Sequence, residues 1–145
     1  MDSIDLKIIE LLQKNSRMTS SDISKQVHLS VPAVVERIRK LEDNLFISRY
    51  TLLINREAFD LNLTAFILVS LDRTDNIETF RNTVMQYQCV LECHHLAGEY
   101  DYMLKIVLKN TKALEEFISD KLKKVPGIAK TNTIIALSTL KEEAL

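Results

Sequence analysis

Apolar residues recur every three or four positions in the first part of the chain, and this spacing predicts three short helices. The first helix is expected over residues 2–14. The second begins after Thr19 and the third after Ser30, because both residues are good helix N-caps, and a tight turn at residues 28–30 separates them. Two helices joined in this way form a helix-turn-helix unit, whose second helix enters the major groove in DNA-binding proteins.

The third helix, which is expected to end near Asp43, is the candidate element for contacting DNA. Its buried face should hold Val34, Ile38 and Leu41, which recur at helical spacing. The predicted DNA contacts lie on its outward face and in its first turn: Ser30, Val31, Pro32, Val35, Glu36, Arg37, Arg39 and Lys40. Basic side chains there suit phosphates or base edges, but basic residues on a helix are also often only a solvated face.

Two of these residues have alternative roles that stay open. Arg37 can clamp a phosphate, or it can form an internal ion pair with Glu36, Glu42 or an acidic residue of the first helix. Ser30 is first a helix cap, and its hydroxyl or backbone amide can also contact a phosphate.

From residue 63 onward, short apolar runs alternate with helical patterns. Strands are expected at residues 63–71, 90–97, 101–108 and 128–137. One helix is expected before the second strand, and another, capped by Asn110 or Thr111, before the last. This β-α-β-β-α-β order predicts an antiparallel four-stranded sheet with both helices on one face, the ferredoxin-like arrangement. The fold class is therefore α+β, with a winged-helix-like helical unit followed by a ferredoxin-like unit.

These patterns divide the chain into three parts. We place a helix-turn-helix domain at residues 1–47, a connecting strand or hinge at 48–62, and the ferredoxin-like domain at 63–140. Residues 46–55 are rich in β-branched and aromatic side chains, so they are expected to be extended, either as a wing or as a connecting strand.

The predicted sheet has an apolar open face. Because side chains alternate along a strand, Phe66, Leu68, Leu104 and Ile106 cannot all point at the helices. An apolar sheet face left open favours a homodimer with two-fold symmetry. Such a dimer would also present two recognition helices to double-stranded DNA.

Charge and composition limit the possible partners. The net charge of −1 does not suggest a DNA-binding protein as a whole, so an attractive field must come from a local cluster or from several copies of the chain. The chain has no apolar run of membrane length, and its first residues are acidic, unlike a signal leader. We expect a cytoplasmic protein without a membrane partner.

The chain lacks a recognisable set of residues for catalysis or metal binding. Cys89 and Cys93 have no zinc-site spacing and are expected to be buried free thiols. His94 and His95 are adjacent, so in a strand they face opposite ways; we expect partly buried or interface histidines and not a metal pair. We therefore predict neither an enzyme nor a metal or cofactor site.

Four blocks carry a resemblance to a known family: IDLKIIELLQKNSR at 4–17, LSxxAVxxRIxxLE at 29–42, IxxYT at 47–51 and ECHHLAGEYDYML at 92–104. In this order they resemble the Lrp/AsnC family (leucine-responsive and asparagine regulators) of bacterial and archaeal transcription regulators. The last block is similar to the family's signature of a strand, Gly-x-x-Asp-Tyr and a second strand, here Gly98, Asp101 and Tyr102. The resemblance covers almost the whole chain.

The resemblance implies a DNA-binding N-terminal domain and a C-terminal domain that dimerises through its sheet, often with assembly into an octamer. It also implies a small effector, typically an amino acid, bound between dimers near the Gly-x-x-Asp turn, with no cofactor or metal. The implied effector contacts are Leu96, Gly98, Glu99, Tyr100, Asp101, Thr131 and Thr133. A purely local role also stays open, in which Gly98 serves the turn and Asp101 bonds turn amides.

Three residues depart from the family's usual pattern. His28 stands at a turn position that is commonly Gly, and Leu45 and Arg49 stand where the family usually has Gly after the third helix and before the Tyr. Arg49 adds a candidate phosphate contact. Two rival functions also fit the two-domain outline: an enzyme resembling the sirohaem decarboxylases, with His94 or His95 in the chemistry, and an amino-acid sensor without DNA binding. The basic recognition helix argues against the enzyme.

Overall fold

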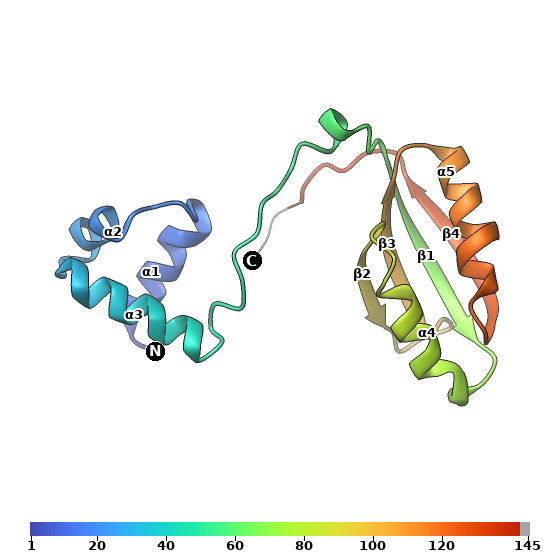
Figure 1. Ribbon diagram of the computed structural model, residues 1–145, viewed down its shortest axis with the longest axis horizontal. Coiled ribbons are helices and arrows are strands. Elements are labelled where there is room, and N and C mark those ends of the chain that lie inside the picture. The colour runs from blue at the N-terminus through green and yellow to red at the C-terminus, as the bar shows by residue number, and fades with distance from the viewer. Residues whose placement is uncertain (143–145) are drawn as a thin grey trace. The chain divides into compact units, whose positions relative to one another are not determined.

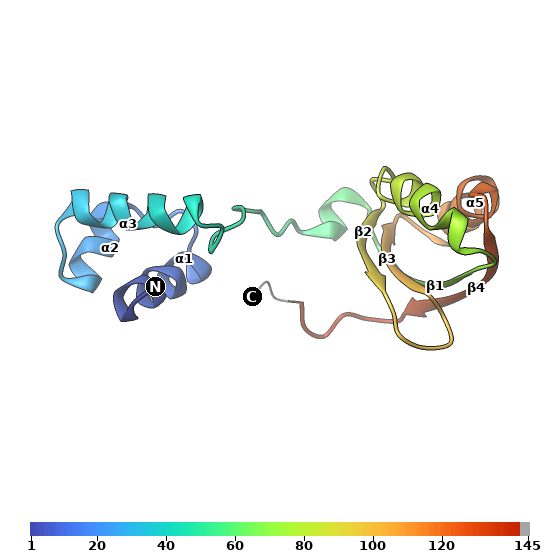
Figure 2. The same cartoon turned by 90° about the horizontal axis from the view of Figure 1, so that it is seen from below.

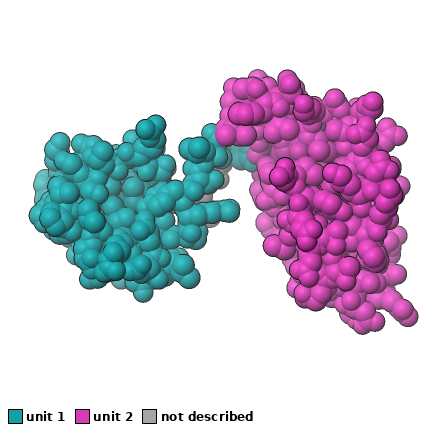
Figure 3. All heavy atoms as spheres, viewed as in Figure 1, with its two compact units in different colours: residues 1–53, 141–145 teal, residues 54–140 magenta. Residues whose placement is uncertain are grey.

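The computed structural model describes residues 1–142 and divides the chain into two compact units, built on residues 1–53 and residues 54–140 (Figure 1; Figure 3). Each unit has a hydrophobic core of its own.

The first unit contains the three predicted helices: α1 (Ser3–Lys14), α2 (Ser20–Val27) and α3 (Val31–Asp43). Their N-caps explain where they begin. Asp2 and Asp5 form a reciprocal capping box at α1, Thr19 accepts a hydrogen bond from the Asp22 amide, and Ser30 accepts one from the Ala33 amide. The core is made by the apolar faces of all three helices, with Ile8, Leu11, Leu12, Ile23, Val34 and Leu41 buried. The predicted helix-turn-helix is confirmed.

Two residues that replace the family's usual glycines adopt left-handed backbone conformations. His28 has φ 55° at the end of α2, and Leu45 has φ 59° just after α3. A side chain in this region costs roughly 1–2 kcal/mol, because Cβ crowds the following carbonyl oxygen. Backbone bonds hold both turns: the His28 amide donates to Ser24, and the Leu45 amide donates to Glu42 at 2.9 Å. His28 and Leu45 therefore adopt the left-handed backbone conformation that glycine would adopt at these positions.

The segment after α3 is not part of a strand. In the part of the chain that the structure describes, no strand lies between α3 and residue 63; a short 3₁₀ turn, Arg56–Phe59, precedes the sheet. The alternative of a wing is therefore wrong for the single chain, because a hairpin needs a pairing strand and none is present. The segment leaves large apolar side chains exposed, among them Phe46, Leu52 and Leu53.

The second unit is a four-stranded sheet covered by helices on one face (Figure 2). Its strands are β1 (Leu63–Leu71), β2 (Val90–His95), β3 (Tyr102–Leu108) and β4 (Ile128–Ala136), in the order β2-β3-β1-β4 with all neighbours antiparallel. The covering helices are α4 (Ile77–Val84), preceded by a 3₁₀ turn at Thr74–Asn76, and α5 (Thr111–Glu116), which continues as a π turn and a 3₁₀ turn to Lys124. The predicted ferredoxin-like topology is confirmed.

Strand register assigns the apolar side chains to the two faces of the sheet. Ile67 of β1 pairs with Leu104, and both are fully buried under the helices. Phe66 and Leu68, whose side chains alternate with that of Ile67, point to the open face and are only partly buried. The prediction that these strands cannot bury every apolar side chain against the helices is confirmed.

Candidate functional site

The outward side of α3 gathers the predicted DNA-contacting residues on one exposed surface, which we call the α3 surface and define by Val31, Val35, Glu36, Arg39 and Lys40. On the buried side of the helix, Val34 is 0% and Leu41 is 3% exposed, so these core contacts fix which face of α3 points outward. Ser30 and Pro32 lie exposed at its start, as the capping geometry requires. An exposed helix of this kind presents side chains as a recognition helix does.

The charges on the α3 surface are paired with one another. Arg39 donates two hydrogen bonds to Glu36, at 3.0 and 2.8 Å, and a third to Asp43 at 3.0 Å. The Lys40 ammonium lies 3.6 Å from the same Glu36 carboxylate. The hydrogen bonds from Arg39 hold the pKa of Glu36 below its usual value. The two cations on this surface therefore share one carboxylate when no DNA is present.

Arg37 forms the internal ion pair that was one of its two open roles. Its guanidinium donates to Asp5 at 2.6 Å and to Asp2 at 2.8 Å, the two acids of the α1 capping box. The hydrogen bond to Asp5, followed by the one to Asp2, raises the pKa of the Arg37 guanidinium. Arg37 therefore ties the start of α1 to the middle of α3 and positions the recognition helix. A phosphate contact by Arg37 stays a prediction, as does one by Arg49, which lies exposed beyond α3.

In the second unit, Asp101 joins β1 to the turn between β2 and β3. Its carboxylate accepts the Leu71 amide at 2.7 Å, and its own amide donates to Val69 at 2.9 Å. Its carbonyl accepts the Leu96 amide at 2.8 Å. The side chain thus bonds an amide of β1, where the local interpretation expected a turn amide. The Leu96–Asp101 hydrogen bond closes the turn, and the bonds of Asp101 to Leu71 and Val69 attach it to β1.

Gly98 has no role within the chain that requires a glycine. A Cβ atom built on it would meet nothing within 4 Å, and it is not among the residues with positive φ. By contrast, Gly127 has φ 86°, and a Cβ atom there would lie 2.3 Å from the Cβ atom of Asn76. The local interpretation of Gly98 therefore has no steric basis in the single chain, and its role toward an effector stays a prediction.

The turn bends over the open face of the sheet (Figure 2). Glu99 accepts a hydrogen bond from Lys130 of β4 at 2.9 Å, and the Lys130 ammonium lies 4.9 Å from the centre of the Tyr100 ring. Ser70, which pairs with Lys130 across β1 and β4, donates to the Glu99 carbonyl at 3.4 Å. The sequence singled out Glu99 and Tyr100 but missed Lys130, which only the strand register brings beside them.

The two predicted threonines lie on the other face. Thr131 pairs with Val69 and Thr133 with Ile67, and both valine and isoleucine are buried under the helices. Directly paired residues share a face, so neither threonine lies with the turn residues in the single chain.

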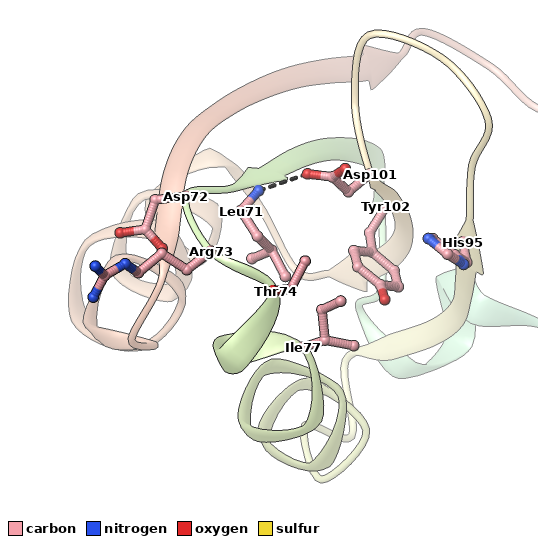
Figure 4. Close-up of a pocket in the computed structure, with 8 residues that line it drawn as sticks. All are labelled: Leu71, Asp72, Arg73, Thr74, Ile77, His95, Asp101 and Tyr102. Atoms are coloured by element: carbon pink, nitrogen blue, oxygen red, sulfur yellow. Dashed lines mark hydrogen bonds between the residues drawn. The ribbon is translucent and has the colours of Figure 1, made fainter.

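A small hollow lies on the helix side of Asp101 (Figure 4). Its volume is about 150 Å³, and it is lined by Leu71, Asp72, Arg73, Thr74, Ile77, His95, Asp101 and Tyr102. The Tyr102 hydroxyl accepts a hydrogen bond from Arg81 at 2.9 Å, and its ring stacks on His95 with centres 4.9 Å apart. Figure 4 shows the charged groups of Asp72 and Arg73 directed away from Asp101 and Tyr102, and the Asp101 carboxylate is bonded to the Leu71 amide, so the hollow is not assigned a charged ligand.

The neighbouring histidines face opposite ways, as predicted. His94 lies 3.0 Å from Glu92 on the open face, whereas His95 stacks on Tyr102 on the helix face. Both are exposed in the single chain, because β2 is an edge strand; partial burial is therefore not found, and the alternative of interface histidines stays a prediction. Cys89 and Cys93 are free, and burial raises the pKa of both thiols. Among the described residues, no group of three or more His, Cys, Asp or Glu is arranged to hold a metal ion.

No helix within residues 1–142 is both long enough and apolar enough to span a membrane.

Comparisons with known proteins cover both units. Residues 1–42 match the AsnC-type helix-turn-helix domain, and residues 64–145 match the Lrp/AsnC ligand binding domain. The leucine-responsive regulatory protein of Escherichia coli (strain K12) is 33% identical over 144 residues, which is 98% of this chain and 88% of that protein.

Two solved structures are similar along the whole chain. A transcriptional regulator of Neisseria meningitidis, crystallised as a complex with L-Met, has a TM-score of 0.94 at 33% identity and covers 99% of this chain and 94% of its own. LrpC of B. subtilis has a TM-score of 0.87 at 31% identity and covers 99% of each chain.

Proposed function

The chain belongs to the Lrp/AsnC family and is a DNA-binding transcription regulator of that type, and we propose that it contacts DNA through the α3 surface and responds to an amino acid bound near the Gly98–Asp101 turn. Because the relatives are transcription regulators, we also propose that the chain is not an enzyme and acts in the cytoplasm, where bacterial DNA lies.

The exposed α3 surface is the observation that carries the DNA-binding part of the proposal. It presents Arg39 and Lys40 beside Val31 and Val35, on a helix whose opposite side packs into the core through the buried Val34 and Leu41. Arginine and lysine neutralise phosphates, and valine methyl groups suit the thymine methyl group in the major groove. Ser30 adds its hydroxyl and Val31 its backbone amide, because Pro32 has no amide hydrogen and the Ala33 amide already donates to the Ser30 hydroxyl.

The effector part of the proposal is supported by the turn and by a relative. Gly98 leaves space that nothing in the chain occupies, and Glu99 and Lys130 offer a carboxylate and an ammonium beside it. An amino acid carries the complementary ammonium and carboxylate groups. The similar regulator of N. meningitidis was crystallised with L-Met, so L-Met is the first effector that we would test.

We further propose that the chain works as a homodimer through the open face of the sheet, with higher assembly to an octamer. Phe66, Leu68 and the half-exposed Ile134 form an apolar strip on this face. Placing Thr131 and Thr133 in an effector site together with Gly98 requires a second chain, because the sheet separates them within one chain.

The test is fluorescence anisotropy of the full chain on the DNA upstream of its own gene, against scrambled DNA, at two salt concentrations and with or without L-Met. We expect preference for the upstream DNA, affinity that falls steeply with salt, and a change in affinity with L-Met. Arg39→Ala and Lys40→Ala should each weaken binding with the fold intact, whereas Lys124→Ala, at an exposed site in the second unit, is the matched control.

Wild-type binding by both α3 variants would refute the assignment of the α3 surface. Amino-acid binding without DNA binding at any salt concentration would favour the alternative of a sensor that acts on another protein. A coloured protein that retains sirohaem would favour the alternative of an enzyme resembling the sirohaem decarboxylases.

A further inference from the structure

Glu36 is an acidic side chain at the centre of a surface that has to approach phosphates. It is the sixth residue of α3, its side chain is 48% exposed, and it lies beside the exposed Val35. Arg39 and Lys40, the two cations expected to meet DNA, both have their charges directed at this carboxylate.

This position has a cost for binding any DNA sequence. When Arg39 and Lys40 turn to phosphates, the Glu36 carboxylate loses its partners and remains near the polyanion, where it is repelled. The cost disappears only where DNA offers a hydrogen-bond donor. In the major groove the donors are the amino groups of cytosine and adenine, and the established pairing of a glutamate is with the N4 amino group of cytosine.

From this geometry we propose that Glu36 is a specificity-determining residue, which reads a cytosine in each half-site and penalises every sequence that lacks it. The inference rests on the proposed function of α3 as the recognition helix and names how that helix selects its site. Arg39 and Lys40 then exchange their contacts with Glu36 for phosphate contacts only on DNA whose cytosine amino group donates a hydrogen bond to the Glu36 carboxylate.

The other acids of α3 do not share this position. Glu42 accepts a hydrogen bond from the Tyr50 hydroxyl at 2.9 Å, so it is held toward the segment after the helix. Asp43 also pairs with Arg39, at 3.0 Å, but it is the last residue of α3, and recognition helices contact bases mainly through their N-terminal residues. Asp43 is thus a matched control: it is an exposed acid on the same arginine, and its neutralisation changes the net charge equally.

The experiment is selection of binding sites from randomised double-stranded DNA by the full-length wild type, Glu36→Gln and Asp43→Asn, with circular dichroism as a check on folding. The selected sites are then compared by competition, with the cytosine pair intact or replaced. For the wild type, replacing that cytosine should weaken binding by roughly tenfold or more.

Glu36→Gln should move the preference at that one position from cytosine to adenine, because glutamine pairs with adenine N6 and N7, and should leave the other positions unchanged. It should also bind scrambled DNA more tightly than Asp43→Asn does. Asp43→Asn should select the wild-type motif.

The inference is overturned if Glu36→Gln selects the wild-type motif with its cytosine unchanged, or if both variants alter the motif in the same way. A wild type that enriches no sequence at all would instead overturn the proposed function on which the inference rests.

Discussion

The two glycines of the second unit, Gly98 and Gly127, offer a direct test of the proposal that an effector binds at the Gly98–Asp101 turn. Gly98 has open space where a Cβ atom would stand, whereas a Cβ atom at Gly127 would lie 2.3 Å from the Cβ atom of Asn76 on a left-handed backbone. Replacing each glycine by alanine adds the same methyl group in two different surroundings. If the geometry of the single chain is all that matters, only Gly127→Ala should have an effect.

The magnitudes follow from these surroundings. An alanine at Gly127 takes on a left-handed conformation, at about 1–2 kcal/mol, and must displace Asn76, at about 1–3 kcal/mol for overpacking. The lower entropy of the unfolded chain gives back about 0.4–1 kcal/mol. The net loss of about 1–5 kcal/mol should lower the Tm by several degrees. Gly98→Ala has neither cost, so its free energy of unfolding should stay equal or rise by up to about 1 kcal/mol.

The assay measures unfolding by urea and by heat, and then L-Met binding by calorimetry. We expect Gly98→Ala to keep its stability and its affinity for DNA but to lose L-Met affinity by tenfold or more, because the methyl group occupies the proposed approach of the ligand. Gly127→Ala should lose stability and keep its L-Met affinity at temperatures where it is folded.

Either of two results would refute the reasoning. Unchanged L-Met affinity in Gly98→Ala would show that the ligand does not approach this glycine. A loss of stability like that of Gly127→Ala would show that Gly98 has a role within the chain that its open surroundings do not reveal.

Three further outcomes are expected from single side chains. Leu45→Gly should raise the Tm slightly, because Leu45 is 78% exposed and its left-handed backbone favours glycine; an unchanged or lower Tm would contradict this. Phe80→Ala should lower the free energy of unfolding by about 3–5 kcal/mol in urea titrations, because the ring is fully buried against Tyr102. Partial desolvation, followed by the hydrogen bond to Glu42, raises the pKa of the half-exposed Tyr50 to about 12. Glu42→Gln should therefore make this tyrosine ionise at lower pH in an ultraviolet titration, and an unmoved curve would refute the contribution of Glu42.

Local patterns predicted most of the fold, because helix caps and alternation are encoded within a few residues. Thr19, Ser30 and Asn110 cap helices in the structure as their types suggested. The strand order followed from the sequence of elements, because short connections allow few topologies.

The site was less predictable because it depends on pairing across long separations. Nothing near Arg37 in the sequence selects Asp2 and Asp5 over Glu36 or Glu42 as its partner; the packing of α1 on α3 decides. Likewise, the register of β4 against β1 places Lys130, and not Thr131, on the face of the turn. A shift of β4 by one residue would exchange the two, and the local sequence does not fix this register. Residue type predicted a region, and the strand register decides which of its residues lie on the same face of the sheet.

The charges of α3 limit how tightly a single copy of the chain can bind DNA. Along its length, Arg37, Arg39 and Lys40 are matched by the acids Glu36, Glu42 and Asp43, and Arg37 is already bound to α1. One copy of this helix therefore offers DNA little net positive charge. Tight binding then requires several copies on one DNA, because linked contacts multiply affinity without any new contact within each copy. If the chain assembles through the open sheet face, as we propose, the assembly supplies the affinity that a single nearly neutral helix lacks. A ligand that alters this assembly would then control DNA binding without contacting α3.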